Sequence, residues 1–436
     1  MMRLFFPFLL VIVMGLLFST VGCTPPEETS LVYPEYGSPP GEDPPDSRGG
    51  SLASPRMAIV DYRTIDFSDP ETVTDYARAE ILVTPASSLW RSDMNLGVAS
   101  ALKAENPDIK IIGYVNAHGS WLRWGDEPDR DPEADPYGWD FYQATKPYWS
   151  YTTEGDTMMA WKGQVLLNIL NEDCRAAMVG ALVDHWYAHD NVFDGIFWDH
   201  FNQVLWVPSS VPGVNGEMDL DGNGIPHRED PDEILAYRLA SEALIQEARA
   251  ALGNDVIQFV NGDRAAKDST FATLVDGMMY EHFPQVGYRG GEEMRQALDP
   301  ANPNSLFAAR TWPRTENGGP WLILTNKYRT SFVDDNGNNI EYRNAEFSRV
   351  AALLTGTLVS YHCDEQLTHY GWPEVEFDLG EPLGGVSIDG DQISREFQHG
   401  MVWLNMTNGG DTFPFDFRIE GDEGLLQSFA YPSHFP

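Results

Sequence analysis

The sequence predicts an α/β protein, a (β/α)8 TIM barrel followed by a small C-terminal β-rich appendage, and three observations predict it. From residue 57 onward, eight short apolar runs alternate with amphipathic or charged stretches, as repeated βα units do. Two of these runs, FDGIFWDHF (193–201) and VDGMMYEHF (275–283), nearly repeat each other, and each reaches a carboxylate followed by His-Phe. No Gly-rich phosphate fingerprint follows the first run, which disfavours the alternative of a doubly wound open sheet.

The first 55 residues have the composition of a leader and a tether. An early Arg, an apolar stretch and small residues predict a lipoprotein-type signal peptide over 1–22. The segment TVGC (20–23) resembles a bacterial lipobox, which implies cleavage before Cys23 and lipidation of Cys23, although Thr20 replaces the usual Leu. An ordinary signal peptide or a retained membrane anchor is the alternative. Residues 23–55, rich in Pro, Gly, Ser and acid, are expected to be a disordered tether, so we expect a secreted lipoprotein anchored on a bacterial cell envelope.

The barrel is expected over residues 56–383. Each strand is a short apolar run, and each helix is a longer stretch with apolar residues at helical spacing. Asn171 and Gly253 are expected to cap the start of one helix and the end of another. In chain order the expected strands are 57–62, 80–83, 110–118, 193–199, 256–263, 276–281, 321–327 and 357–365. The expected helices are 97–107, 171–189, 230–253, 291–298 and 344–356, and the barrel carries insertions at 119–163 and 203–230.

The nearly repeated runs present two acids in equivalent places. Asp199 and Glu281 each lie four residues after a Gly, so period-two alternation puts both on the same face as that Gly. Polar residues at the carboxyl ends of barrel strands form active sites, which makes this pair the candidate catalytic acids; helix or turn capping is the alternative. Other strand ends supply polar side chains suited to sugar hydroxyl groups: Asp61, Asn116, His118, Asn261, Asp263, Lys327 and Asp364. His200 and His282 follow the acids and are expected either to tune the pKa of the neighbouring acid or contact the sugar, or to cap a helix. A third reading makes the His and Asp residues metal ligands, but no compact ligand spacing such as HExxH supports it.

The insertion 119–163 is rich in aromatic residues among Asp, Pro and Gly. Flat rings on a loop can stack on sugar faces, and Trp121 and Trp124 are the candidates for such contacts. The alternative is that these rings pack on one another, because a long loop needs internal contacts to be ordered.

The second insertion contains the segment MDLDGNGIPHRED (218–230), whose spacing is that of a calcium loop. Loop positions one, three, five, six, seven and twelve fall on Asp219, Asp221, Asn223, Gly224, the carbonyl of Ile225, and Asp230. The segment departs from an EF-hand in ending on Asp, in containing a Pro, and in lacking an evident preceding helix. Because the spacing of the oxygen ligands is kept, a structural calcium is predicted, with an acidic turn as the alternative. No cofactor is expected for catalysis.

Composition limits the partners. The formal net charge of -38 opposes electrostatic binding to nucleic acid or to an anionic membrane, and it favours a neutral or cationic ligand. Membrane contact is therefore expected only through the lipid anchor. Cys174 and Cys363 remain after Cys23, and the sequence leaves open whether they pair, as it does the oligomeric state. Residues 384–436 alternate β-rich pieces with turn residues, which predicts the C-terminal appendage.

Several segments together resemble a known family. They are DGIFWDH (194–200), the Asp-rich insertion after it, NGD (261–263), WPEVEFDLGEPLGG (372–385) and REFQHGMVWLN (395–405). They look like the hypothetical glycosyl hydrolase barrels of bacterial secreted proteins, and the resemblance runs from residue 57 onward. It implies a TIM-type barrel with glycosidase activity and supplies no substrate. Together with the expected secretion, it predicts an enzyme that cleaves glycosidic bonds of an extracellular oligo- or polysaccharide.

Glycoside hydrolysis needs one carboxylic acid and one carboxylate, and the two acids can fill both roles. By analogy with barrel glycosidases whose acids lie on strands four and six, Asp199 is assigned as nucleophile and Glu281 as acid/base. The sequence leaves open whether the mechanism is retaining or inverting. Two other functions stay open: a non-catalytic carbohydrate-binding lipoprotein, and a metal-dependent hydrolase on the same barrel.

Overall fold

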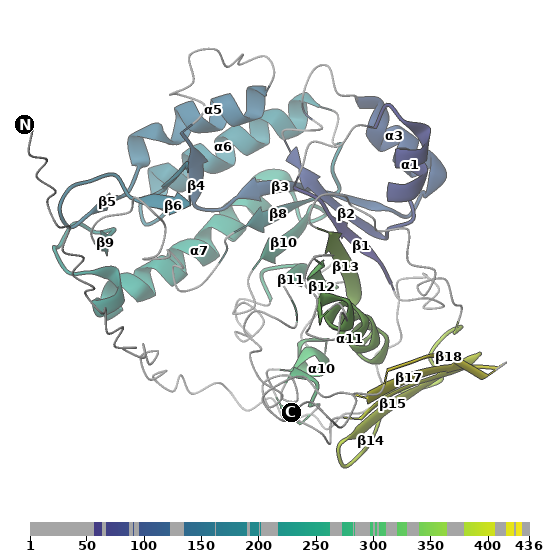
Figure 1. The fold of residues 1–436 in the computed structure, drawn as a ribbon. Helices are drawn as coiled ribbons and strands as arrows, with labels where there is room; N and C mark the ends of the chain where they lie inside the picture. The colour runs from purple at the N-terminus through teal and green to yellow at the C-terminus, as the bar shows by residue number, and fades with distance from the viewer. Residues whose placement is uncertain are drawn as a thin grey trace, which may run out of the picture. The chain divides into compact units, whose positions relative to one another are not determined.

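The fold is taken from a computed structural model of the chain (Figure 1). The described residues are 56–62, 67–86, 90, 96–122, 135–161, 163–189, 192–199, 201, 217–261, 273–281, 283, 297–299, 301–302, 305–310, 321–328, 340–363, 379–405, 416–422 and 424–429. The signal peptide, the tether and Cys23 lie outside these residues and stay predictions. Among the helices that the structure does describe, none combines the length and the apolar character that crossing a membrane requires.

Eight parallel strands form one sheet in the order of the chain, as predicted. They are β1 (Ala58–Val60), β2 (Ile81–Pro85), β3 (Lys110–Asn116), β8 (Gly195–Asp199), β10 (Ile257–Asn261), β11 (Gly277–Tyr280), β12 (Trp321–Tyr328) and β13 (Leu358–Cys363). A parallel bridge between Met57 and Val359 joins the two edges, where the Val359 N–H also donates to the Arg56 carbonyl at 2.9 Å. The sheet therefore closes on itself, and the TIM-barrel prediction is confirmed.

Helices alternate with these strands, and several begin or end where the sequence predicts. They are α1 (Pro70–Tyr76), α3 (Leu96–Glu105), α6 (Glu172–Ala188), α7 (Pro231–Leu252), α10 (Leu306–Arg310) and α11 (Ile340–Thr355). Asn171 caps α6 by accepting from the Asp173 N–H, Asp230 caps α7, and Gly253 ends α7 with a φ of 106°. The helix expected over 291–298 lies mostly outside the described residues. Helix α1 was not predicted, because among its seven residues only Tyr76 is buried.

Alternate residues of each strand face the barrel interior, as period two requires. Phe197, Phe259 and Met279 belong to one cluster of interior side chains, together with Val60, Ile112 and Ile323 from neighbouring strands. The intervening residues, such as Trp198 and Met278, pack in the larger cluster that contains the helices. Residues two positions beyond Phe197 and Met279 therefore continue the interior face at the carboxyl ends of their strands.

The Asp-Gly pair that opens each nearly repeated run fixes the amino end of its strand. Asp194 accepts from the Ile111 N–H at 2.9 Å and pairs with Lys103, also at 2.9 Å. Asp276 does the same with the Gln258 N–H at 2.7 Å and Arg249 at 2.9 Å. Each Asp thus ties its strand both to the neighbouring strand and to a preceding helix.

The glycines of the same pairs are required by packing. A Cβ on Gly195 would overlap the carbonyl oxygen of Ile257, and a Cβ on Gly277 would overlap the ring of Phe259. The Asp-Gly half of each run therefore has a structural role.

The aromatic insertion has secondary structure of its own. Strands β4 (Gly119–Trp121), β6 (Met159–Trp161) and β7 (Gln164–Leu166) form a small sheet, and α5 (Pro136–Thr145) packs beside α6. The rings of Tyr142 and Trp149 meet edge to face with centroids 6.0 Å apart. A further pair of strands, β5 (Tyr151–Thr152) and β9 (Met218–Asp219), links the two insertions. The described aromatic contacts fit the reading that the insertion packs on itself.

The C-terminal segment forms a five-stranded antiparallel sheet, in agreement with the predicted appendage. Its strands are β14 (Ser387–Asp389), β15 (Gln392–Phe397), β16 (Gly400–Asn405), β17 (Asp416–Gly421) and β18 (Gly424–Phe429). Arg395, 3% exposed, donates to the carbonyls of Leu353 and Leu354 at the end of α11. These bonds join the sheet to the last helix of the barrel. Cys174 of α6 is a buried free thiol, and burial raises its pKa to about 12, whereas the Cys363 side chain lies outside the described residues.

Candidate active site

Asp199 and Glu281 come together at the carboxyl ends of their strands. Asp199 is the last residue of β8 and is 7% exposed, while Glu281 directly follows β11. Strand β10 lies between these two strands and ends on Asn261. The Asn261 amide nitrogen donates to Asp199 Oδ1 at 2.7 Å and to Glu281 Oε2 at 3.0 Å. One side chain therefore bridges the two acids that the sequence predicts to be catalytic.

The shared nitrogen limits how far apart the two carboxylates lie. Because two sides of the triangle are 2.7 and 3.0 Å, the third side, from Asp199 Oδ1 to Glu281 Oε2, is shorter than about 6 Å. If each acid takes one of the two amide hydrogens, the separation is about 5 Å, since these hydrogens diverge by roughly 120°. Retaining glycosidases hold their acids about 5–5.5 Å apart, and inverting ones about 6.5–9.5 Å apart.

Two tyrosines lie on the Asp199 side of the site. The Tyr114 hydroxyl, on β3, donates to Asp199 Oδ2 at 2.6 Å. Tyr62, just beyond β1, packs on Tyr114 with ring centroids 4.9 Å apart and directs its hydroxyl to the Met279 sulfur at 3.7 Å. Burial, followed by the charge of Asp199, raises the pKa of the Tyr114 phenol well above the ordinary value, and Glu281 adds to this. The Tyr114 hydroxyl therefore stays protonated at neutral pH.

Of the other strand-end residues expected in the site, one bonds the acids and three bond other parts of the protein. Asn261 lies in the site, but Asp61 is fully buried on the helix side, where the Tyr76 hydroxyl donates to it at 2.7 Å. Asn116 donates to Gln164 and accepts from the backbone of the turn after β3. His118 is 1% exposed, with its Nδ1 3.4 Å from the Tyr237 hydroxyl. The polar contacts described for Asp61, Asn116 and His118 are therefore with the protein itself.

The remaining expected contacts stay predictions. Trp121 lies on β4 and is half-buried, with its ring beside Gly163. The side chain of Lys327 lies outside the described residues, although its strand is described. Also outside are Trp124, His200, Asp263, His282 and Asp364.

Tyr62 and Tyr114 were missed, although the sequence carries the signal for both. Alternation from Ala58 and Val60 puts Tyr62, and not Asp61, on the interior face. The same rule applied backward from Asn116 puts Tyr114 there. A search for polar strand ends misses both residues because their rings are apolar, although the Tyr114 hydroxyl bonds Asp199.

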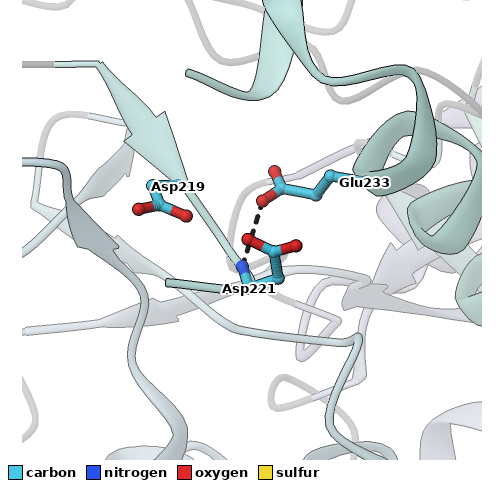
Figure 2. A group of neighbouring side chains, drawn as sticks. All are labelled: Asp219, Asp221 and Glu233. Carbon is cyan, nitrogen blue, oxygen red and sulfur yellow. Dashed lines mark hydrogen bonds between the residues drawn. The ribbon is translucent and has the colours of Figure 1, made fainter. Parts of the chain in front are cut away.

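The calcium-like loop brings together three carboxylates, one of which the loop spacing does not predict. Oxygens of Asp219, Asp221 and Glu233 lie within 4.8 Å of one another (Figure 2). Glu233 projects from α7, is buried, and accepts from the Leu220 and Asp221 N–H groups at 2.8 and 3.0 Å. Oxygen ligands of this kind fit Ca²⁺.

The other expected ligands have different surroundings. Asp230 Oδ1 caps α7, and its Oδ2 accepts from the Asn223 amide at 2.6 Å, a bond that lowers the Asp230 pKa. The Asn223 oxygen accepts from the Ile225 N–H at 2.7 Å. The carboxylate best placed to join Asp219 and Asp221 is therefore Glu233, and Asp230 has a helix-capping role.

The profile of Hypothetical glycosyl hydrolase family 15 matches residues 103–401, which make up more than half of the chain and contain both acids. The chain belongs to this family. This membership agrees with the resemblance that its sequence segments carry. No curated protein matches the chain.

Three solved structures are similar to this chain at low identity and low TM-score. An α-galactosidase from Geobacillus stearothermophilus in complex with 1-deoxygalactonojirimycin is 10% identical, with a TM-score of 0.41, over 87% of this chain and 54% of that one. A noncanonic maltogenic α-amylase from Thermotoga neapolitana is 10% identical, with a TM-score of 0.44. The match covers 86% of this chain and 99% of the amylase chain. An α-L-fucosidase from Paenibacillus thiaminolyticus is 10% identical, with a TM-score of 0.43. The match covers 71% of this chain and 46% of the fucosidase chain. This chain thus spans about half the length of the galactosidase, and the ligands of these proteins assign no substrate to it.

Proposed function

We propose that this glycoside hydrolase cleaves an extracellular oligo- or polysaccharide by a retaining mechanism, with Asp199 and Glu281 as its two catalytic carboxylates. The observation that carries the proposal is the single Asn261 amide nitrogen bonded to both acids, which keeps the two bonded oxygens within about 6 Å of each other, the range of retaining enzymes. Tyr114 and Asn261 donate to Asp199, and these bonds stabilise the carboxylate form that a nucleophile needs. Glu281 is then the acid/base.

The chemistry follows from these roles. Asp199 attacks the anomeric carbon while Glu281 gives its proton to the leaving oxygen, so one C–O bond forms as another breaks. Water then enters, Glu281 takes back a proton, and the resulting hydroxide displaces Asp199 from the anomeric carbon. Two inversions leave the anomeric configuration unchanged, and no metal is needed for either step.

A substrate screen followed by NMR tests this function. The purified protein without its expected signal peptide and tether (residues 56–436) is incubated with a panel of aryl glycosides and polysaccharides, with and without EDTA. NMR then records the anomeric configuration of the first product before mutarotation. We expect hydrolysis that persists in EDTA, with the first sugar released in the configuration of the substrate. An inverted first product contradicts the retaining proposal. Carbohydrate binding without turnover favours a non-catalytic lipoprotein, and complete loss in EDTA favours a metal-dependent hydrolase.

A structural calcium held by Asp219, Asp221 and Glu233 is proposed for the loop before α7, since their oxygens lie within 4.8 Å. Calcium binds the folded state, so excess Ca²⁺ is expected to raise the melting temperature by ~5 °C over the EDTA-treated protein. Asp219→Asn should abolish this response. The control Asp108→Asn, in the turn after α3, should keep it. Equal melting temperatures of the wild-type protein in calcium and in EDTA would show that the loop is an acidic turn.

We also propose that Cys23 carries a lipid that anchors the body to a bacterial cell envelope, so that the enzyme acts on glycans outside the cell. The support is the lipobox-like TVGC (20–23) and the polar tether after it. Detergent-phase partitioning of the full chain, lost in Cys23→Ala, is the expected result. An unchanged partition of that variant contradicts the anchor.

A further inference from the structure

We infer that Asn261 and Tyr114 are positioning residues that set the distance between the two catalytic acids and the orientation of the nucleophile. This inference rests on the proposed function. Asn261 ends β10, the strand between β8 and β11, and its one amide nitrogen donates to an acid on either side. Because the two bonds share one atom, movement of either carboxylate away from that nitrogen lengthens a bond of the pair.

Tyr114 fixes the second oxygen of Asp199. Its hydroxyl donates to Oδ2 at 2.6 Å while Asn261 donates to Oδ1 at 2.7 Å, so rotation of the carboxylate would break both bonds. The Tyr114 ring is held in turn, since it stacks on Phe197 with centroids 6.1 Å apart and contacts Tyr62. The donor that orients Asp199 is therefore fixed by packing and not only by the bond itself.

The chemical nature of the two donors suits this task. An amide and a phenol donate hydrogen bonds without carrying a positive charge, so they hold Asp199 and Glu281 in place without neutralising either acid. A Lys or Arg in the same position would form an ion pair and stabilise both acids in their charged form. The raised pKa of Tyr114 keeps its hydroxyl a donor across the working pH range.

Two substitutions test the inference directly. Asn261→Ala is expected to lower kcat by about 100-fold, and Tyr114→Phe by about 10- to 100-fold, because misplaced reacting groups and lost charge-assisted bonds have effects of this size. KM should change by less than about threefold, since ground-state sugar contacts remain. The matched control is Gln258→Leu, which removes a buried amide of the same strand that bonds Trp198 and Ile245 instead. Its kcat should stay within about threefold of wild type.

The isosteric change Asn261→Asp tests whether position 261 lies beside both acids in the active enzyme. It adds a third negative charge next to them, and this charge favours their protonated forms. Both limbs of the pH–rate profile are therefore expected to move to higher pH, by roughly one unit. A side chain remote from the acids would leave the profile unmoved, and the separation of the acids in Asn261→Ala tests the positioning role itself.

Three results would overturn the inference. They are an Asn261→Ala enzyme with wild-type kcat, an Asn261→Asp profile that superimposes on wild type, and a crystal structure of Asn261→Ala with an unchanged separation of Asp199 and Glu281. We expect that separation to change by about 1 Å. The crystal structure decides the matter even if no substrate is found. If Asp199→Asn and Glu281→Gln are inactive while the Asn261 variants are not, the positioning role fails and the proposed function stands; active Asp199→Asn or Glu281→Gln variants refute the function itself.

Discussion

Asp199→Asn and Glu281→Gln are each expected to lower kcat by at least about 10⁴-fold, because each removes a group that forms or breaks a bond in the transition state. Asn cannot act as the anionic nucleophile, and Gln cannot give up a proton. Both amides match the acids in size, so the melting temperature should change little. Initial rates on the best substrate of the panel, measured with circular dichroism of each variant, check the prediction.

Asp194→Asn is the matched control for this pair. It replaces an acid at the other end of β8, where Asp194 bonds the Ile111 N–H and Lys103. The control should lose some stability and keep kcat within about threefold of wild type. Full activity in either Asp199→Asn or Glu281→Gln would show that the bridged acids are not the catalytic pair.

The largest effect on stability is expected for Gly195→Ala, which should lower the free energy of unfolding by more than ~3 kcal/mol. The added Cβ would overlap the Ile257 carbonyl oxygen, a backbone atom that β10 holds in the sheet. Side-chain rotation cannot relieve this overlap, so β8 and β10 must separate and their hydrogen bonds must lengthen. Chemical denaturation followed by far-UV circular dichroism measures the loss.

Gly180→Ala is the control for the same chemical change. Gly180 lies inside α6, and a Cβ there meets no atom within 4 Å. Ala in a helix interior is favoured over Gly, so this variant should gain roughly 0.5–1 kcal/mol. A Gly195→Ala protein as stable as wild type would contradict the packing account of the Asp-Gly pairs.

The sequence predicted the barrel well because its strands are short apolar runs with a consistent period. All eight strands occur in the expected order, and the caps Asn171 and Gly253 lie where helices begin and end. Period two also put Asp199 and Glu281 on the interior face. The same period, applied to the first strand, would have chosen Tyr62 over Asp61, which faces α1.

Other features depend on contacts between segments that are distant in the chain. Glu233 belongs to the helix after the calcium-like loop, and only the fold brings it to Asp219 and Asp221. The bridge by Asn261 likewise requires β10 to lie between β8 and β11. A polar strand end is visible in the sequence, but the partners of its side chain are not.

Trapping the covalent intermediate tests the central claim most directly. A 2-deoxy-2-fluoro glycoside of the sugar found in the screen, with a good leaving group, should slow the second step and leave the sugar attached to the nucleophile. We expect peptide mass spectrometry to find one sugar per chain, on Asp199, and none on the Asp199→Asn protein. A label on any other carboxylate would contradict the assignment of Asp199 as the nucleophile of this enzyme.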